Sequence, residues 1–331
     1  MEVVFAHPAF LRFEALLRER LDSEHSVRFA GVAECGDPHA RFEETEVLVT
    51  ARFPKEWAPR FPALKLLHAA GAGLDKVEVS ALPSGARVCC TFGHGASIAE
   101  FVIMVMLALL RGLLPADREL RRDHWVNPLY HFGLPLPDML EGKTVVIVGT
   151  GEIGCALAKL APAFRARCVG INRTGRRDFG GVFDRVEPLA ALYDVLPEAD
   201  FLIVAVPLTD ETRGLIGEKE LSLLKPAAYL VNVARGPVVE EAALFHALRN
   251  RALAGAAIDV WYNYASADSD RAEPSRFPFR DLDNVIMTPH FSGITHATFR
   301  HRAEDVAGNI LALAAGRPLR NEVIRAPSAS R

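Results

Sequence analysis

Residues 143–154 constrain the fold of this chain more than any other segment. An apolar run at 144–148 leads directly into the sequence Gly-Thr-Gly-Glu-Ile-Gly, and a helical pattern follows. In a G-x-G-x-x-G turn, Gly149 permits a tight bend, Gly151 lets the backbone approach a pyrophosphate, and Gly154 lets the helix pack close to the strand. The amino end of that helix presents unpaired N–H groups and a positive dipole end to phosphate. Strand, turn and helix together predict a dinucleotide site; the alternative is a glycine-rich turn that binds nothing.

The end of the next predicted strand bears on which dinucleotide is bound. An NAD-binding fold has an Asp or Glu about 20 residues after the glycines, where it accepts hydrogen bonds from the ribose. Here residues 166–171 end at neutral Asn172, which is followed by three arginines within the five residues 173–177. Guanidinium groups pair with a 2′-phosphate that a carboxylate would repel. The sequence therefore favours NADP, with NAD as the possible alternative; the basic residues would otherwise form a solvated surface loop.

Length and composition exclude several classes of protein. A chain of 331 residues predicts about two domains, and its formal net charge of −3 favours neither nucleic acid nor an anionic membrane as a partner. Five cysteines without a C-x-x-C pair indicate reduced thiols in the cytoplasm, rather than disulfides or a metal site. The amino-terminal residues lack the pattern of a secretory signal. The longest apolar run, 101–110, is far shorter than the ~20 residues of a membrane span and predicts a buried helix.

Strand and helix signals alternate along two parts of the chain. The first hundred residues predict a small parallel α/β unit, and the alternation resumes at Thr144 to give a doubly wound sheet. Strands are expected at 3–6, 26–29, 47–50, 64–69, 88–90, 144–148, 167–171, 201–205, 228–232, 254–259 and 285–287. The helix at 97–111 is apolar on nearly every side, so we expect it to pack between domains or subunits. A helix at 295–315 is expected to cross back to the first unit.

Several further segments, in their order and spacing, resemble the D-isomer-specific 2-hydroxyacid dehydrogenase family. They cover about residues 45–295 and include Gly-Ala-Gly-Leu-Asp-Lys-Val (71–77), Ser-Ile-Ala-Glu (97–100), Pro-Leu-Thr-Asp-Glu-Thr (207–212), Val-Asn-Val-Ala-Arg-Gly (231–236), Gly-Ala-Ala-Ile-Asp-Val (255–260) and Asn-Val-Ile-Met-Thr-Pro-His (284–290). The resemblance implies a Rossmann-type parallel sheet, residues 97–293, inserted into a smaller flavodoxin-like substrate domain, residues 1–96 and 294–331. It also implies reversible hydride transfer between a nicotinamide and a 2-oxo or D-2-hydroxy acid.

The resemblance also implies the roles of individual residues. Arg235 corresponds to the catalytic arginine, and its planar fork suits a substrate carboxylate and the neighbouring C2 oxygen. His290, in Thr-Pro-His, corresponds to the acid/base that exchanges a proton with that oxygen. The remaining predicted residues bind substrate or cofactor. For the substrate they are Gly71, Ala72, Gly73 and His94; for the cofactor they are Gly149, Gly151, Glu152, Ile153, Gly154, Asn172, Arg173, Thr174, Val206, Pro207, Thr212, Val233, Ala234, Asp259, Ser292 and Gly293.

Two positions depart from the family pattern. The family usually has a Glu five residues after the position of Asp259, where it pairs with the histidine, but this chain has Tyr264. An insertion in the following segment offers Glu273 as a replacement catalytic carboxylate. His94 stands where many members carry Asn, and it either touches the substrate or serves as a helix-entry side chain.

We therefore expect an NADPH-preferring reductase of small 2-oxo acids of the glyoxylate or hydroxypyruvate type. One alternative is NAD-linked oxidation of a D-2-hydroxy acid. Another is a non-catalytic, corepressor-like scaffold that binds a dinucleotide on the same fold, because a fold does not fix a function. The apolar helix at 97–111 and the family resemblance also predict a homodimer.

Overall fold

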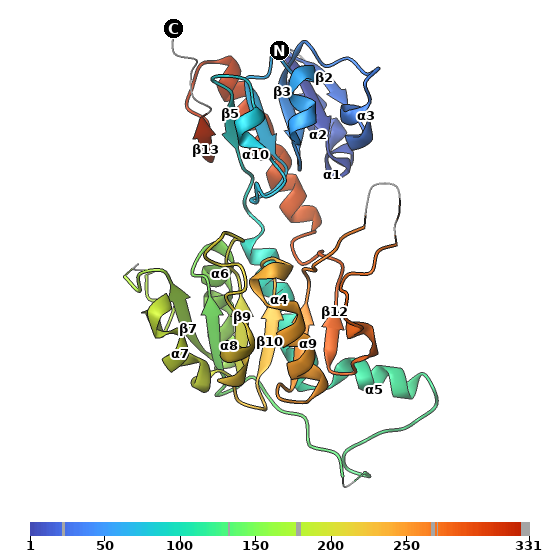
Figure 1. Ribbon diagram of the computed structural model, residues 1–331, viewed down its shortest axis with the longest axis vertical. Helices are drawn as coiled ribbons and strands as arrows, with labels where there is room; N and C mark the ends of the chain where they lie inside the picture. Colours follow the sequence, from blue (N-terminus) through green and yellow to red (C-terminus); the bar gives the residue numbers. More distant parts are fainter. Residues whose placement is uncertain (22–23, 132, 177–179, 266–268, 270, 326–331) are drawn as a thin grey trace. The chain divides into compact units, whose positions relative to one another are not determined.

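Two compact units make up the chain in the computed structural model, which describes residues 1–21, 24–131, 133–176, 180–265, 269 and 271–325. The first unit contains Met1–Gly93 together with Thr295–Arg331, and the second contains His94–Ile294. The chain therefore leaves the first unit after its fifth strand and returns to it through the long carboxy-terminal helix (Figure 1). The predicted glycine turn lies in the second unit.

The second unit is a doubly wound α/β layer built on a seven-stranded parallel sheet. Its strand order is β12-β11-β10-β9-β6-β7-β8, so the chain runs outward from β6 on one side and then on the other, which creates a switch point between β6 and β9. β6 is buried at every position, as expected for a central parallel strand covered on both faces. The strands are β6 (Thr144–Val148), β7 (Arg167–Asn172), β8 (Arg185–Pro188), β9 (Phe201–Val204), β10 (Tyr229–Asn232), β11 (Gly255–Ile258) and β12 (Val285–Met287).

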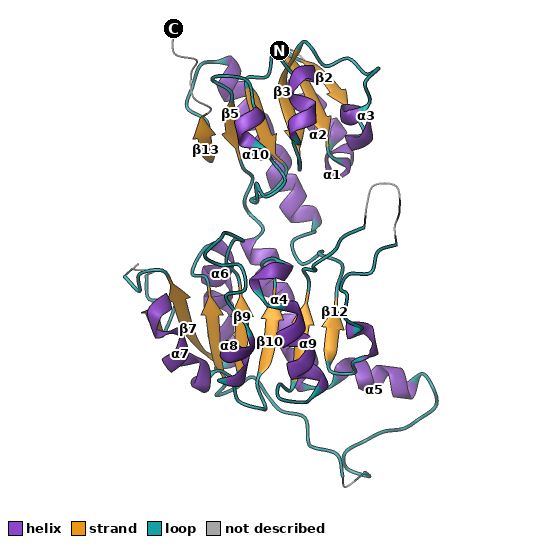
Figure 2. Cartoon of the chain, viewed as in Figure 1, coloured by secondary structure: helices purple, strands orange, loops and turns teal. Residues whose placement is uncertain are grey.

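Helices cover both faces of this sheet (Figure 2). One hydrophobic cluster joins α4 and α6 to the sheet, and another joins it to α7, α8 and α9. The second unit's helices are α4 (Gly95–Leu110), α5 (Leu113–Leu120), α6 (Glu152–Leu160), α7 (Leu192–Val195), α8 (Glu218–Ser222) and α9 (Glu241–Arg249). Short 3-10 turns occupy Ala161–Phe164, Leu189–Ala191, Leu196–Glu198, Gly236–Val238 and Phe279–Asp281.

The first unit has a six-stranded sheet in the order β13-β5-β4-β3-β1-β2. Its five parallel strands follow the flavodoxin-like order, and β13 adds an antiparallel edge. The strands are β1 (Glu2–Ala6), β2 (Ser26–Phe29), β3 (Thr45–Thr50), β4 (Leu66–Ala69), β5 (Arg87–Cys89) and β13 (Glu322–Arg325); the helices are α1 (Pro8–Leu11), α2 (Glu14–Leu21), α3 (Val32–Gly36) and α10 (His296–Ala314), with 3-10 turns at Lys55–Arg60 and Val79–Ala81. Phe299, Ala303 and Val306 of α10 are buried in the cluster that also contains residues of α1 and α2.

The expected strands are present, but the sequence pattern missed two. β8 and β13 are short edge strands, and each has only two apolar or proline positions among four residues. An edge strand needs little apolar content because one of its sides faces solvent. β13 pairs with β5, although the two strands are far apart in the sequence. An ion pair between Arg87 and Glu322 also holds β13 against β5.

None of the helices in the described chain is by itself both long and apolar enough to cross a bilayer. Only α4 and α5 taken together, which are bent by 62° relative to each other, meet the length and composition required. Nine residues of α4 are buried, among them Ile98, Val102 and Met106, but Met104 is 54% exposed, so this unit by itself does not cover α4 on every side.

Candidate functional site

The sequence-predicted residues of the second unit gather at one edge of its sheet. Every described strand pair in this sheet is parallel, so the carboxyl ends of the strands share an edge. Gly149 follows β6, Asn172 ends β7, Arg235 follows β10 and Asp259 follows β11. Open α/β sheets bind their ligands outside this edge, at the switch point.

The glycine turn after β6 has the backbone that its spacing predicts. Gly149 has φ 112°, and a Cβ there would lie 2.4 Å from the carbonyl oxygen of Ala205. A Cβ on Gly154 would lie 2.1 Å from the carbonyl oxygen of Gly149, so the helix packs directly on the turn. Around Gly151 there is open space, and no side chain caps α6 at its amino end. The residues present therefore fit a phosphate group approaching the first turn of α6.

The side chain of Glu152 is engaged within the protein. Its Oε1 accepts a hydrogen bond from the backbone N–H of Gly95 at 3.1 Å, and its Oε2 lies 4.0 Å from Nδ1 of His94. His94 stands at the amino end of α4, and a Cβ on Gly293 would lie 3.6 Å from the Cβ of His94. Glu152 thus ties α6 to the start of α4, and only its backbone is available for a phosphate. Ile153, the next residue, packs against the cluster that contains α4 and α6.

Asn172 organises the loop after β7. Its amide nitrogen donates to Oγ1 of Thr150, in the glycine turn, at 3.1 Å. Its amide oxygen accepts from the backbone N–H groups of Thr174 at 3.0 Å and Gly175 at 2.7 Å. The two loops expected to hold the dinucleotide are therefore joined by one side chain. Arg173 is exposed beside it.

A compact turn follows β9, which lies on the other side of β6 from β7. The hydroxyl of Thr212 donates to the carbonyl oxygen of Pro207 at 2.6 Å, which closes the turn after half-buried Val206. The Thr209 hydroxyl donates to the carboxylate of Glu211 at 2.7 Å and lowers the pKa of Glu211. The positive charge of Arg173 lowers this pKa further, but more weakly. The negative charge of Glu211, in the turn after β9, therefore interacts with the positive charge of Arg173, in the loop after β7.

Arg235 follows β10 after two buried residues, Val233 and Ala234. The Arg235 side chain is half-buried, and its Nη1 donates to the carbonyl oxygen of Ala234 at 2.8 Å. The next residue, Gly236, is required by close packing, because a Cβ there would lie 2.4 Å from the carbonyl oxygen of Trp261. The segment after β10 is thereby pressed against the segment after β11.

Asp259 holds the loop that carries His290. The Asp259 side chain is 1% exposed; its Oδ1 accepts from the Thr288 hydroxyl at 2.7 Å and from the Phe291 N–H at 3.0 Å, and its Oδ2 accepts from the Ser292 N–H at 3.0 Å. His290, within this loop, has φ 58°, a left-handed conformation that is uncommon outside glycine. Such a conformation persists where surrounding bonds impose it. The bonds of Asp259 on both sides of His290 supply that constraint.

The ring of Tyr264 lies against the ring of His290. Their centroids are 5.6 Å apart, and the Tyr264 hydroxyl oxygen accepts from the backbone N–H of Trp261 at 3.1 Å. An aromatic ring therefore occupies part of the surroundings of His290 at the position where the family pattern has a Glu. The carboxylate of Glu273 is 80% exposed and lies 3.9 Å from Nη1 of Arg280. Among the described residues, no contact joins Glu273 to His290.

In the first unit, the predicted Gly71-Ala72-Gly73 segment is a turn directly after β4. The carbonyl oxygen of Gly71 accepts from the N–H of Thr91 at 3.2 Å, which ties the turn to the end of β5. Ala72 and Gly73 are exposed, so their backbone is open to solvent.

Two supporting residues were not predicted from the sequence. Thr150 is buried within the glycine turn and receives the Asn172 amide, and its place inside the motif was the available signal. Trp261 donates from its indole nitrogen to the carbonyl oxygen of Thr288 at 2.9 Å. This bond holds the His290 loop in addition to the bonds of Asp259. No pattern in the sequence indicates this contact, because it joins residues of two separate loops.

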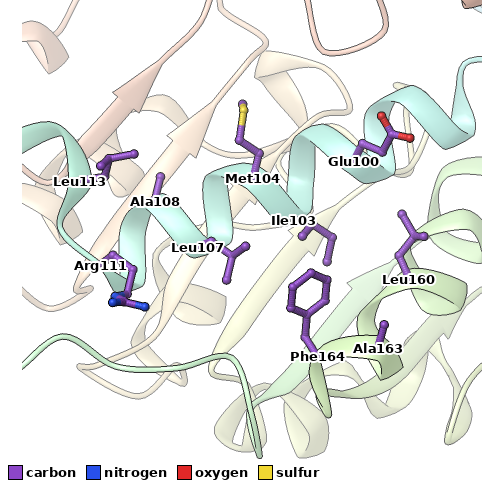
Figure 3. A pocket seen from close by; sticks show the side chains of 10 residues that line it. All are labelled: Glu100, Ile103, Met104, Leu107, Ala108, Arg111, Leu113, Leu160, Ala163 and Phe164. Carbon is purple, nitrogen blue, oxygen red and sulfur yellow. The ribbon is translucent and has the colours of Figure 1, made fainter.

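An apolar hollow of about 610 Å³ lies on the second unit, away from the carboxyl ends of the strands (Figure 3). It is formed mainly by α4, α6 and the turn after α6. Its lining residues are Glu100, Ile103, Met104, Leu107, Ala108, Arg111, Leu113, Leu160, Ala163 and Phe164. Nearby α5 has no buried residue, so the unit itself does not cover this helix.

Comparison with known proteins agrees with this arrangement. Residues 103–292 match the model of the "D-isomer specific 2-hydroxyacid dehydrogenase, NAD binding domain". A glyoxylate reductase of Thermofilum pendens is 34% identical over 81% of this chain and 77% of its own. A solved NADPH-dependent glyoxylate/hydroxypyruvate reductase of Sinorhizobium meliloti, in complex with citrate, is 27% identical, with a TM-score of 0.80 over 99% of both chains. A second structure described as that reductase, with NADP and malonate, is 28% identical, with a TM-score of 0.78 over 100% of this chain and 98% of the other.

The family match covers the glycine turn, Arg235, Asp259 and His290. The similarity to whole chains extends through both units, including the carboxy-terminal helix of the first. From the motif order, the two parallel sheets and these comparisons together, the chain belongs to the D-isomer specific 2-hydroxyacid dehydrogenase family.

Proposed function

We propose that this protein is an NADPH-preferring reductase of small 2-oxo acids, with glyoxylate and hydroxypyruvate as representative substrates. The observation that carries the proposal is the arrangement of Arg235 and His290, which follow the two strands on either side of β11 at the edge that bears the glycine turn. The reductase activities by which the similar proteins are named support it. In this proposal the second unit binds the dinucleotide and the first unit contributes to binding the substrate.

A bound nicotinamide dinucleotide supplies the reducing equivalents for the C2 carbonyl. The turn at 149–154, with Asn172, Thr212 and the buried pair before Arg235, would hold this dinucleotide. The guanidinium of Arg235 pairs with the substrate carboxylate and orients the C2 oxygen through charge-assisted hydrogen bonds. The imidazole of His290 donates a proton to that oxygen and takes it back in the reverse direction. Asp259 acts through the loop by keeping His290 in its left-handed conformation.

A screen of 2-oxo acids tests the activity itself. We expect oxidation of NADPH, followed by absorbance, with glyoxylate or hydroxypyruvate and purified full-length protein. Turnover confined to NAD with D-2-hydroxy acids would favour the oxidative alternative. Dinucleotide binding without turnover in either direction would favour a scaffold and would overturn the proposed reductase.

Arg173 is the described residue that we expect to select NADPH. It follows Asn172, carries a positive charge and lies near the ionised Glu211. Replacing Arg173 with Gln should lower kcat/KM for NADPH by about tenfold, because a charge-assisted bond to the 2′-phosphate is lost. The value for NADH should change little. Glu211→Gln is the matched control, because removal of a negative charge beside Arg173 should raise kcat/KM for NADPH. If Arg173→Gln lost kcat/KM equally with NADPH and NADH, the assignment of Arg173 would be contradicted.

We also infer that a second copy of the chain covers the apolar hollow and α5, so that the enzyme is a homodimer. Exposed apolar side chains continue from the hollow along the following segment, and monomers rarely expose such extended patches. They include Met104, Leu113, Leu120, Trp125, Leu129, Tyr130, Leu136 and Met139. Sedimentation equilibrium should give twice the chain mass of 36.2 kDa; a mass of one chain at micromolar concentration would contradict the dimer.

The cysteines bear on the cellular compartment of the protein. All five are free and four of them are buried, which supports the cytoplasm as the compartment.

A further inference from the structure

A cationic side chain lies beside the Gly71-Ala72-Gly73 turn in the first unit. Arg302, from α10, donates from Nη1 to the carbonyl oxygen of Ala70 at 3.3 Å, directly before the turn. Its guanidinium carbon lies 5.1 Å from the centre of the Phe299 ring. Arg302 is half-buried, so its position is set by packing and hydrogen bonding rather than by solvent alone.

His7 lies on the same aromatic support. It follows β1, and its ring stacks on Phe299 with centroids 6.3 Å apart. Burial and, to a smaller extent, the positive charge of Arg302 lower the pKa of His7 to about 4, so the ring is neutral near pH 7. Nδ1 accepts from the N–H of Ala9 at 3.3 Å at the start of α1. The proton of the neutral ring is therefore on Nε2, which makes that atom a hydrogen-bond donor.

These groups share the carboxyl edge of the first sheet. His7 follows the end of β1 and Gly71 follows the end of β4, and these strands are parallel members of one sheet. Arg302 adds guanidinium N–H groups, His7 adds one imidazole N–H, and the exposed turn adds backbone N–H groups. A set of donors around one positive charge is the complement of a carboxylate.

We propose that Arg302 and His7 form, with the Gly71-Ala72-Gly73 turn, an anion subsite that binds a carboxylate of the substrate. This inference rests on the proposed reductase function and deepens it, because it names a cation of the first unit that recognises a carboxylate of the substrate. Arg302 is a binding residue in this proposal, whereas His7 contributes one neutral donor.

Oxalate is a suitable probe because it carries carboxylates and is not reduced. Calorimetry on the full-length protein should show oxalate binding whose Kd rises about tenfold or more in Arg302→Met, the loss expected when a charged hydrogen-bonding partner is removed. His7→Asn should raise the Kd by a smaller factor, because Asn still caps α1 while the Nε2 donor is lost. Arg300→Met is the matched control: Arg300 is on the same helix but pairs with Glu304, and its loss should leave the Kd unchanged.

A purely structural role for Arg302 predicts a different result. In that case Arg302→Met would lower the melting temperature and weaken NADPH and oxalate binding alike, whereas a binding role raises the KM for glyoxylate with the KM for NADPH unchanged. The subsite is overturned if wild-type protein binds no oxalate, or if Arg302→Met binds it as wild type does. Arg302-dependent oxalate binding in a protein that reduces no 2-oxo acid would instead refute the proposed function while the subsite stands.

Discussion

Replacing His290 with Asn should lower the turnover of 2-oxo acid reduction by about 10² or more, because the group that donates the proton to the C2 oxygen is removed. Asn is chosen because it tolerates the left-handed backbone that His290 adopts, with φ 58°. The loop should therefore keep its shape, and the loss should appear in kcat while the KM for NADPH stays near that of wild type. Steady-state kinetics with saturating NADPH measures this effect.

Glu273→Gln serves as the control for His290. The carboxylate of Glu273 is largely exposed beside Arg280, so we expect near wild-type turnover from this variant. A loss comparable to that of His290→Asn would restore Glu273 as the carboxylate partner. Wild-type turnover in His290→Asn would remove His290 from the chemistry.

The second large effect is expected from Asp259→Asn. The buried carboxylate accepts hydrogen bonds from Thr288, Phe291 and Ser292, and the amide of Asn would turn an N–H group toward donors. A buried donor left unpaired costs about 1–3 kcal/mol of folding free energy. Release of the loop would also misplace His290, and a misplacement of about 1 Å can cost about 10²-fold in rate. We therefore expect a large loss of turnover together with a lower free energy of unfolding, measured by kinetics and by denaturant titration.

Asp200→Asn separates loss of position from loss of stability. Asp200 also accepts a backbone hydrogen bond, from Thr144 at 2.8 Å, and it pairs with Lys225, but it precedes β9 and so lies at the opposite edge of the sheet. This variant should be destabilised and should keep its turnover. If Asp259→Asn lost stability and kept full turnover, the carboxylate would be a purely structural group.

Local sequence patterns predicted most of the architecture. The central strands are continuous apolar runs bounded by glycine, proline or polar residues, and each is present in the structure. The edge strands β8 and β13 were missed, because their stability comes from pairing with β7 and β5 rather than from their own apolar content. A pairing partner elsewhere in the chain leaves no signal in the residues of the edge strand itself.

The glycine turn follows from local sequence, because the spacing at 149–154 matches steric limits that only glycine satisfies. The polar residues that end the parallel strands can be recognised from local sequence too. How those residues are held depends on contacts between separate parts of the fold. Folding joins Asn172 to the glycine turn, engages Asp259 with the His290 loop, and brings Tyr264 rather than Glu273 against the imidazole. Spacing along one strand is local, whereas hydrogen bonds and ring contacts between loops depend on where separate strands end, so they cannot be read from any one segment.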